Sequence, residues 1–154
     1  MIALAEETFN AQERNYLLSE HLLETGQVKI TPGGFGAIDD HFVPFMPISD
    51  LLRIMAVRLN ATKSLDKDMI VALSLTDMKN RAEPSDYSLH IRTGILEALP
   101  KEAETAEFTV ATDSLVWKNL GLGKLDPHEA VEKGEVTITG GEPEAFYEFL
   151  GLFN

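Results

Sequence analysis

The stretch GKLDPHEAVEKGEVTITGGEPEAFYEFLGLF, residues 123–153, predicts a short helix, a strand and an amphipathic helix in succession. Asp126 and Pro127 are of the types found at a helix N-cap and first turn, and Gly134 is of the type that ends a helix. Val136 and Ile138 alternate with polar residues, as in a half-exposed strand. The final helix carries an apolar face made of Ala145, Phe146, Phe149, Leu150 and Phe153.

The same stretch contains two features that suggest chemistry, and both are better explained as structure. Lys124 follows Gly123, but a phosphate-binding loop needs a Ser or Thr after the lysine, and Leu125 stands there. Asp126 and Glu129 have the three-residue spacing of a capping box. We therefore expect Asp126 to accept from the Glu129 amide and Glu129 to reach back to the Asp126 amide. His128 then lies in the exposed first turn.

Upstream of this stretch the sequence predicts helices first and strands afterwards. Residues 3–25 read as a helix, residues 31–47 as an irregular loop, and residues 48–59 as an amphipathic helix. Four strand-like runs follow, at residues 69–75, 87–92, 95–99 and 108–111, and their short spacing suggests an antiparallel meander. A helix at 113–120, capped by Thr112 or Asp113, completes an α+β domain.

Composition limits the classes of function. The chain has 154 residues, no cysteine and a net charge of −12. Such acidity repels phosphate backbones, so we expect no nucleic-acid partner. The first residues lack a signal peptide and no apolar run is long enough to span a bilayer. These features predict a cytoplasmic protein, with a periplasmic one open if a leader has been lost.

Catalytic and metal-binding patterns are nearly absent from the sequence. The four histidines show no zinc-ligand spacing, and no GxSxG phrase occurs. His90 and Asp86 are the nearest approach to a strand-borne pair, which we interpret as a surface contact. We expect no cofactor, no metal site and no catalytic residue.

Several phrases together resemble the C-terminal part of bacterial alkyl sulfatases. They are AVRLN at 56–60, the Thr76-Asp77 pair and the run from Gly123 to Phe153. Residues 10–26, NAQERNYLLSEHLLETG, resemble the dimerisation helix of that family, with Glu13 in place of a tryptophan. The zinc motif THxHxDH of the family's catalytic domain is missing, so no catalytic residue carries over.

The resemblance implies a sterol-carrier-protein-like α+β domain at residues 47–154. Its sheet would have about five mostly antiparallel strands covered by helices. Residues 1–46 would form an extra N-terminal helix and an irregular linker. By the same resemblance the protein is a homodimer, and we place Phe9, Tyr16 and Leu23 of the first helix at the interface.

Three functions follow from this interpretation. The first is an apolar tunnel for a lipid or alkyl chain, a role that needs no catalysis. Its predicted walls are Leu52, Met55, Leu59, Leu73, Leu89, Leu115, Leu120, Val131, Phe146, Phe149 and Phe153. The second is a structural or dimerisation module with a filled core and no ligand. The third, less favoured, is a part of an alkyl sulfatase that requires a separate zinc-containing catalytic domain.

Overall fold

The computed structural model describes residues 10–26, 38–79 and 81–153. The chain divides into two compact units, Met1–Ile38 and Asp39–Asn154. In the first unit, helix α2 spans Ala11–Glu24 and lies within the predicted helix at 3–25, whose residues 3–9 fall outside the described part. Among the described residues, no helix combines the length and apolar character needed to cross a membrane.

The second unit is built on one five-stranded mixed sheet. The strands are β1 (Asp68–Leu75), β2 (Asp86–Arg92), β3 (Ile95–Leu99), β4 (Phe108–Thr112) and β5 (Val136–Thr139). Their order across the sheet is β3-β2-β1-β4-β5. Only the β1–β4 pair is parallel, and the other three pairs are antiparallel. The predicted α+β class and the mostly antiparallel five-stranded sheet are therefore confirmed.

The predicted antiparallel meander of four strands is wrong for its fourth member. Strands β1, β2 and β3 do follow one another as hairpins, but β4 pairs with β1 instead of β3, with Leu73 opposite Val110. Parallel neighbours need a connection that returns the chain to the same end of the sheet. Here the β2–β3 hairpin and the loop at 100–107 make that return. The spacing of the strands in the sequence does not indicate that β4 pairs with β1.

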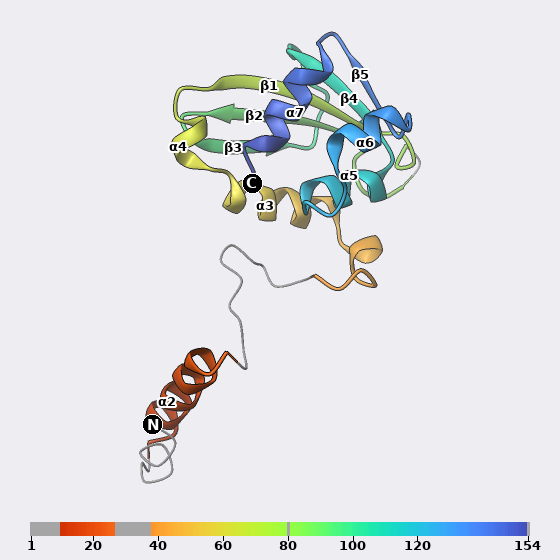
Figure 1. Ribbon diagram of the computed structural model, residues 1–154. Helices are drawn as coiled ribbons and strands as arrows, with labels where there is room; N and C mark the ends of the chain where they lie inside the picture. Colours follow the sequence, from red (N-terminus) through yellow and green to blue (C-terminus); the bar gives the residue numbers. More distant parts are fainter. Residues whose placement is uncertain (1–9, 27–37, 80, 154) are drawn as a thin grey trace. The chain divides into compact units, whose positions relative to one another are not determined.

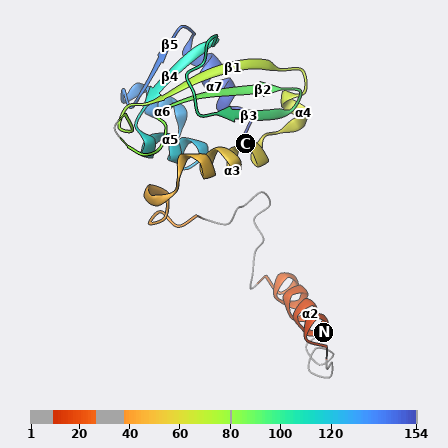
Figure 2. The same ribbon diagram turned by 180° about the vertical axis from the view of Figure 1, so that it is seen from behind.

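Helices cover one face of this sheet. The helical elements of this unit are the 3-10 helix η1 (Val43–Phe45), α3 (Ile48–Arg58), α4 (Ala61–Ser64), α5 (Ser114–Gly121), α6 (Pro127–Glu132) and α7 (Pro143–Gly151). Helix α7 crosses in front of the strands in Figure 1 and behind them in the reversed view of Figure 2. The helices predicted near 48–59, 113–120 and from 143 are present. Elements η1 and α4 were not predicted, because neither is long enough to show a periodic pattern.

The core lies between this helical layer and the inner face of the sheet. Val71, Leu73 and Leu75 of β1 are buried and point the same way, as the two-residue period of a strand requires. Trp117 of α5 and Phe146 of α7 are fully buried against the other side of the core. Each such side chain contributes roughly 1.5–3 kcal/mol by leaving water, so this layer accounts for most of the domain's stability.

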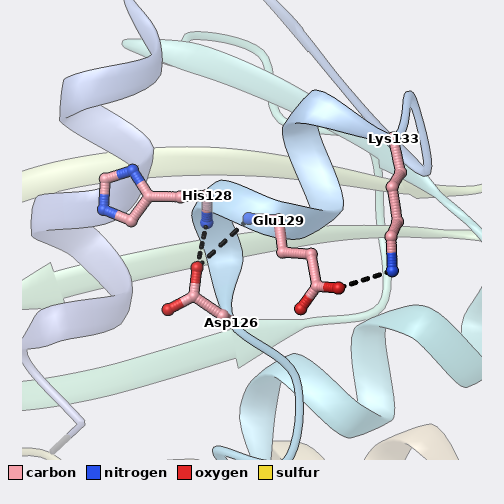
Figure 3. Close-up of polar contacts among 4 residues, drawn as sticks. All are labelled: Asp126, His128, Glu129 and Lys133. Atoms are coloured by element: carbon pink, nitrogen blue, oxygen red, sulfur yellow. Dashed lines mark hydrogen bonds and ion pairs between the residues drawn. The ribbon is translucent and has the colours of Figure 1, made fainter.

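The capping prediction for Asp126 is confirmed in one direction only (Figure 3). Asp126 Oδ1 accepts from the amides of His128 at 2.9 Å and Glu129 at 3.1 Å, and Pro127 opens α6. The expected return bond is absent, since the Glu129 carboxylate contacts Lys133 Nζ at 2.5 Å instead. A lysine four residues later on the same helix face offers a charged partner that the Asp126 amide does not.

The segment before α3 is attached to the domain by specific contacts. Val43 is buried, and Lys118 Nζ of α5 donates to the carbonyl oxygen of Pro44 at 2.9 Å. Asp40 pairs with Lys124 at 2.5 Å. Burial lowers the pKa of the Lys118 ammonium, against the opposing effect of nearby Glu83. The described part of the predicted irregular loop is thus ordered, while a domain boundary at 46/47 stays a prediction.

Candidate apolar-ligand site

Most of the predicted tunnel walls meet in one place, the core between sheet and helices. Nine of these residues belong to a single buried cluster: Leu52, Met55, Leu59, Leu73, Leu89, Leu120, Phe146, Phe149 and Phe153. Val131 packs against the cluster while partly exposed. The apolar pattern of the sequence therefore identified neighbouring residues, although a shared core does not by itself make a cavity.

Leu115 is the exception among the predicted walls. It is the second residue of α5 and is 41% exposed, outside the buried cluster. Trp117, Leu120 and Gly121 form the inward side of α5, and a residue two positions before Trp117 on a helix points to the opposite side. Leu115 therefore cannot line the interior of this domain.

The interior is occupied by aromatic side chains that contact one another. The Phe149 ring lies edge-on to Phe153, with centroids 5.3 Å apart, and to Phe108, with centroids 6.4 Å apart. Both geometries are favourable for aromatic pairs. A ligand that entered between these rings would have to displace Phe149 or Phe153.

An apolar cleft opens beside this core, between α3 and the edge strand β3. It encloses about 420 Å³, within the range of roughly 300–1,000 Å³ that is usual for small-molecule sites. Its lining combines residues from α3, from the start of β2 and from β3: Ser49, Leu52, Arg53, Ala56, Glu83, Pro84, Tyr87, Leu96, Ala98 and Pro100. Leu52 is the one residue of this lining that the sequence analysis named.

Two charged groups belong to the lining of the cleft. Arg53 is mostly exposed and contacts Asp50 at 3.1 Å on the same helix. Glu83 accepts the Ile48 amide at 3.3 Å and so holds the start of α3 beside the cleft. Burial, reinforced by Glu83, raises the pKa of the Tyr87 phenol, which therefore remains neutral at physiological pH. The cleft thus combines an apolar lining with one cation and one anion near it.

Sequence reasoning missed Ala56, Tyr87, Leu96 and Ala98. Leu96 and Ala98 alternate along β3 with Ile95 and Glu97, which was a usable signal that they share an inner face. The position of β3 at the sheet edge, next to α3, was not readable from the sequence. The cleft depends on that position.

The stretch at 121–125 does not have the free amides of a phosphate-binding loop. The amides of Gly123, Lys124 and Leu125 donate to carbonyls of Leu120 and Asn119, which occupies the N–H groups that a phosphate loop would present. His128 stacks on Tyr147 with ring centroids 3.7 Å apart. This part of the chain therefore serves the packing of α5, α6 and α7.

The predicted contact of His90 with Asp86 is wrong. His90 Nε2 lies 2.6 Å from Asp68 Oδ1 on the adjacent strand, while Asp86 accepts from the Ser85 hydroxyl at 2.5 Å. The antiparallel register of β1 and β2 brings Asp68 close to His90 across the ladder. Within the described residues no three acidic or histidine side chains converge as metal ligands would, and the expected lack of a metal stays a prediction.

The predicted dimer interface cannot be read from the structure. Phe9 lies outside the described residues, as do the side chains of Tyr16 and Leu23 in α2. Their described neighbours Leu18 and Leu22 are 38% and 37% exposed. The interface stays a prediction.

The fold and the cleft define an α+β domain with a candidate apolar-ligand site. A family model described as alkyl sulfatase C-terminal matches residues 38–154, which is well over half of the chain. The chain belongs to this alkyl sulfatase C-terminal family, as the sequence phrases indicated. No match was found among curated proteins.

Solved structures of two alkyl sulfatases share the fold of this chain. A stereoselective inverting sec-alkylsulfatase from Pseudomonas sp. has 23% identity and a TM-score of 0.72, over 97% of this chain and 22% of its own. A double mutant of a sec-alkyl sulfatase gives 24% identity and 0.71 over the same shares. Sterol carrier protein 2 has 18% identity and a TM-score of 0.47, over 68% of this chain and 91% of its own. This chain thus spans about a fifth of the alkyl sulfatases that it matches.

Proposed function

We propose that this chain is a non-catalytic module that binds an alkyl chain or other lipid in the cleft between α3 and β3. The observation that carries the proposal is the apolar lining of that cleft by Leu52, Ala56, Leu96 and Ala98. Membership of the alkyl sulfatase C-terminal family is consistent with an alkyl ligand. In this proposal the reaction itself belongs to a separate zinc-containing domain.

An upper limit on the affinity follows from complete burial of the alkyl chain. Burial of a methylene contributes about 0.8 kcal/mol, so a dodecyl chain gains roughly 10 kcal/mol before costs. Association and ordering remove about half of this gain, leaving about 5 kcal/mol. That free energy corresponds to a dissociation constant on the order of 0.1 mM. Binding at this level requires no charge contact, which suits a chain with a net charge of −12.

The test is a fluorescence titration with 11-(dansylamino)undecanoic acid. Ala56 lines the cleft from α3, so Ala56→Trp fills the cleft and is expected to abolish saturable binding. Val57→Trp is the matched control, because Val57 is 72% exposed on the same helix and does not line the cleft. Equal loss in both variants, or no binding by the unaltered chain, would refute the proposal. A thermal melt of each variant checks that it is folded.

A structural role without a ligand is the second candidate. It is favoured by the ring contacts of Phe149 with Phe108 and Phe153, which fill the interior. In this role the N-terminal segment joins two copies through Phe9 and through Tyr16 and Leu23 of α2. Sedimentation velocity tests it: Tyr16→Asp should yield monomers, whereas Asn15→Asp, with the same charge change on an exposed neighbour, should leave a dimer. A monomeric unaltered chain would exclude it.

A hydrolase that acts alone is the least favoured of the hypotheses, because the zinc motif of the alkyl sulfatases is missing from this sequence. The chain alone should neither retain zinc nor turn over an alkyl sulfate. Measured turnover by the zinc-loaded chain would overturn the assignment as a non-catalytic module.

A further inference from the structure

Strand β3 is an edge strand whose outer backbone groups face away from the sheet. It pairs only with β2, and the two strands are joined by a two-residue turn at Thr93 and Gly94, both at positive φ. Such a turn makes its flanking residues, Arg92 and Ile95, a hydrogen-bonded pair. Counting along the ladder, Glu97 and Leu99 also direct their backbone groups to β2.

The backbone N–H and C=O groups of Leu96 and Ala98 therefore point outward from the edge. Within the described residues, no hydrogen bond to another element reaches these groups. Their side chains point to the inner face and line the cleft beside α3. The edge thus combines unpaired ladder groups with an apolar recess, which are the two features that recognise an added strand.

The charge on this edge distinguishes among three candidate ligands: a second copy of the chain, an alkyl chain and an extended peptide. Glu97 lies between Leu96 and Ala98 and points to the opposite, solvent-facing side. If a second copy paired its own β3 antiparallel across this edge in the register centred on Glu97, this residue would stand directly opposite Glu97 of that copy, and like charges at that position are destabilising. An alkyl chain would fill the recess but leave the backbone groups without partners. An extended peptide with a basic residue facing Glu97 would pair with the outward backbone groups and would also fill the recess.

We propose that the β3 edge binds an extended segment of another polypeptide with the alternation apolar–basic–apolar. The two apolar side chains enter the cleft beside Leu96 and Ala98, and the basic side chain lies next to Glu97. Pro100, which follows β3, limits the paired stretch to a few residues and so favours a short linear motif over a long strand. The segment occupies the same cleft as the proposed alkyl ligand, so the two exclude each other.

The test uses the full ¹⁵N-labelled chain and the acetylated, amidated heptapeptide Ser-Thr-Val-Lys-Val-Thr-Ser. Titration followed by NMR should shift the Leu96 and Ala98 amides and slow their hydrogen exchange. A peptide N-methylated at the residues that donate to the edge should not bind. Shifts that never saturate, or that lie away from β3, would overturn the proposal.

Exchanging the charges of Glu97 and of the peptide lysine tests the proposed strand pairing more stringently. Glu97→Lys should weaken binding about fivefold, and a peptide with Glu in place of Lys should recover it. Glu102→Lys, the same change at an exposed position beyond β3, should leave the affinity unaltered. Equal effects of both variants, or no recovery by the exchanged peptide, would contradict the proposed strand pairing. The dansyl probe does not depend on Glu97, so failure here is distinguishable from failure of alkyl-chain binding.

Discussion

Asp77 fixes the start of α5 from outside the helix, and its removal should destabilise the domain measurably. Asp77 Oδ1 accepts the Ser114 amide at 2.8 Å, and Oδ2 accepts the Ser114 hydroxyl at 2.7 Å. Asp113 caps the next amide of the same helix. Because α5 carries the buried Trp117, a less stable helix start would also weaken the packing of the core.

The magnitude follows from these two bonds. A hydrogen bond to a charged group contributes about 1.5–3 kcal/mol, and a negative charge at a helix N-terminus about 0.3–1 kcal/mol. Asp77→Asn retains one acceptor oxygen, so we expect a loss of about 1–2 kcal/mol in the free energy of unfolding. For a domain of this size that loss lowers Tm by about 3–6 °C.

The effect should depend on pH in a defined direction. Burial alone would raise the pKa of the Asp77 carboxyl, but the hydrogen bonds from Ser114 outweigh it and hold the pKa below the usual 3.8. A carboxyl with a depressed pKa in the folded state stabilises the protein above its unfolded pKa. That contribution is lost as pH falls through the folded value. The difference between unaltered chain and Asp77→Asn should therefore be full at pH 6 and shrink below about pH 4.

Urea denaturation followed by Trp117 fluorescence is the assay, since Trp117 is the sole tryptophan and is fully buried. Ser114→Ala and the double variant complete a cycle that isolates the side-chain coupling. Asp113→Asn is the control, because Asn caps a helix as well as Asp does. A loss for Asp77→Asn that is no larger than for this control, or that does not change between pH 6 and pH 3, would refute the reasoning.

Three further perturbations probe the packing. A chain that begins at Pro47 should be about 2–4 kcal/mol less stable in a urea titration than one that begins at Asp39, because the buried Lys118 loses its acceptor. Equal stability of the two chains would contradict this role of Lys118. Phe149→Ala should cost about 3–5 kcal/mol, and a loss below 1 kcal/mol would mean that the interior is not filled as described. Gly121→Ala should lower the free energy of unfolding by about 1–3 kcal/mol, measured by calorimetry, because the added Cβ would lie 2.9 Å from the sulfur of Met55 in α3. An unchanged Tm would contradict that close approach.

Local features of the fold were predictable because their causes are local. The cap at Asp126 and the helix stop at Gly134, which adopts a φ of 72°, depend on residues within one turn of each other. The partner of Glu129 was not predictable in the same way, since Lys133 and the Asp126 amide were both within reach. Glu129 forms the ion pair with Lys133, four residues later, instead of the bond to the Asp126 amide.

Features that depend on residues far apart in the chain could not be predicted from the sequence. The apolar alternation of β4 is the same whether it pairs with β3 or β1, so Phe108 and Val110 could be assigned to the core but not to a neighbour. For the same reason most of the residues predicted as tunnel walls could be assigned to the core as a group, while the open cleft was not predicted. That cleft exists because β3 ends the sheet next to α3, and only Leu52 belongs to both sets.

The central claim is that an apolar ligand binds between α3 and β3. Intermolecular NOEs between the methylenes of dodecanoate and methyl-labelled protein test it directly. The account predicts NOEs to the methyl groups of Leu52, Leu96 and Ala98, with the rings of Phe149 and Phe153 unperturbed. NOEs confined to those two rings would place the ligand in the interior, and a ligand without NOEs to any of these residues would leave the domain without the proposed site.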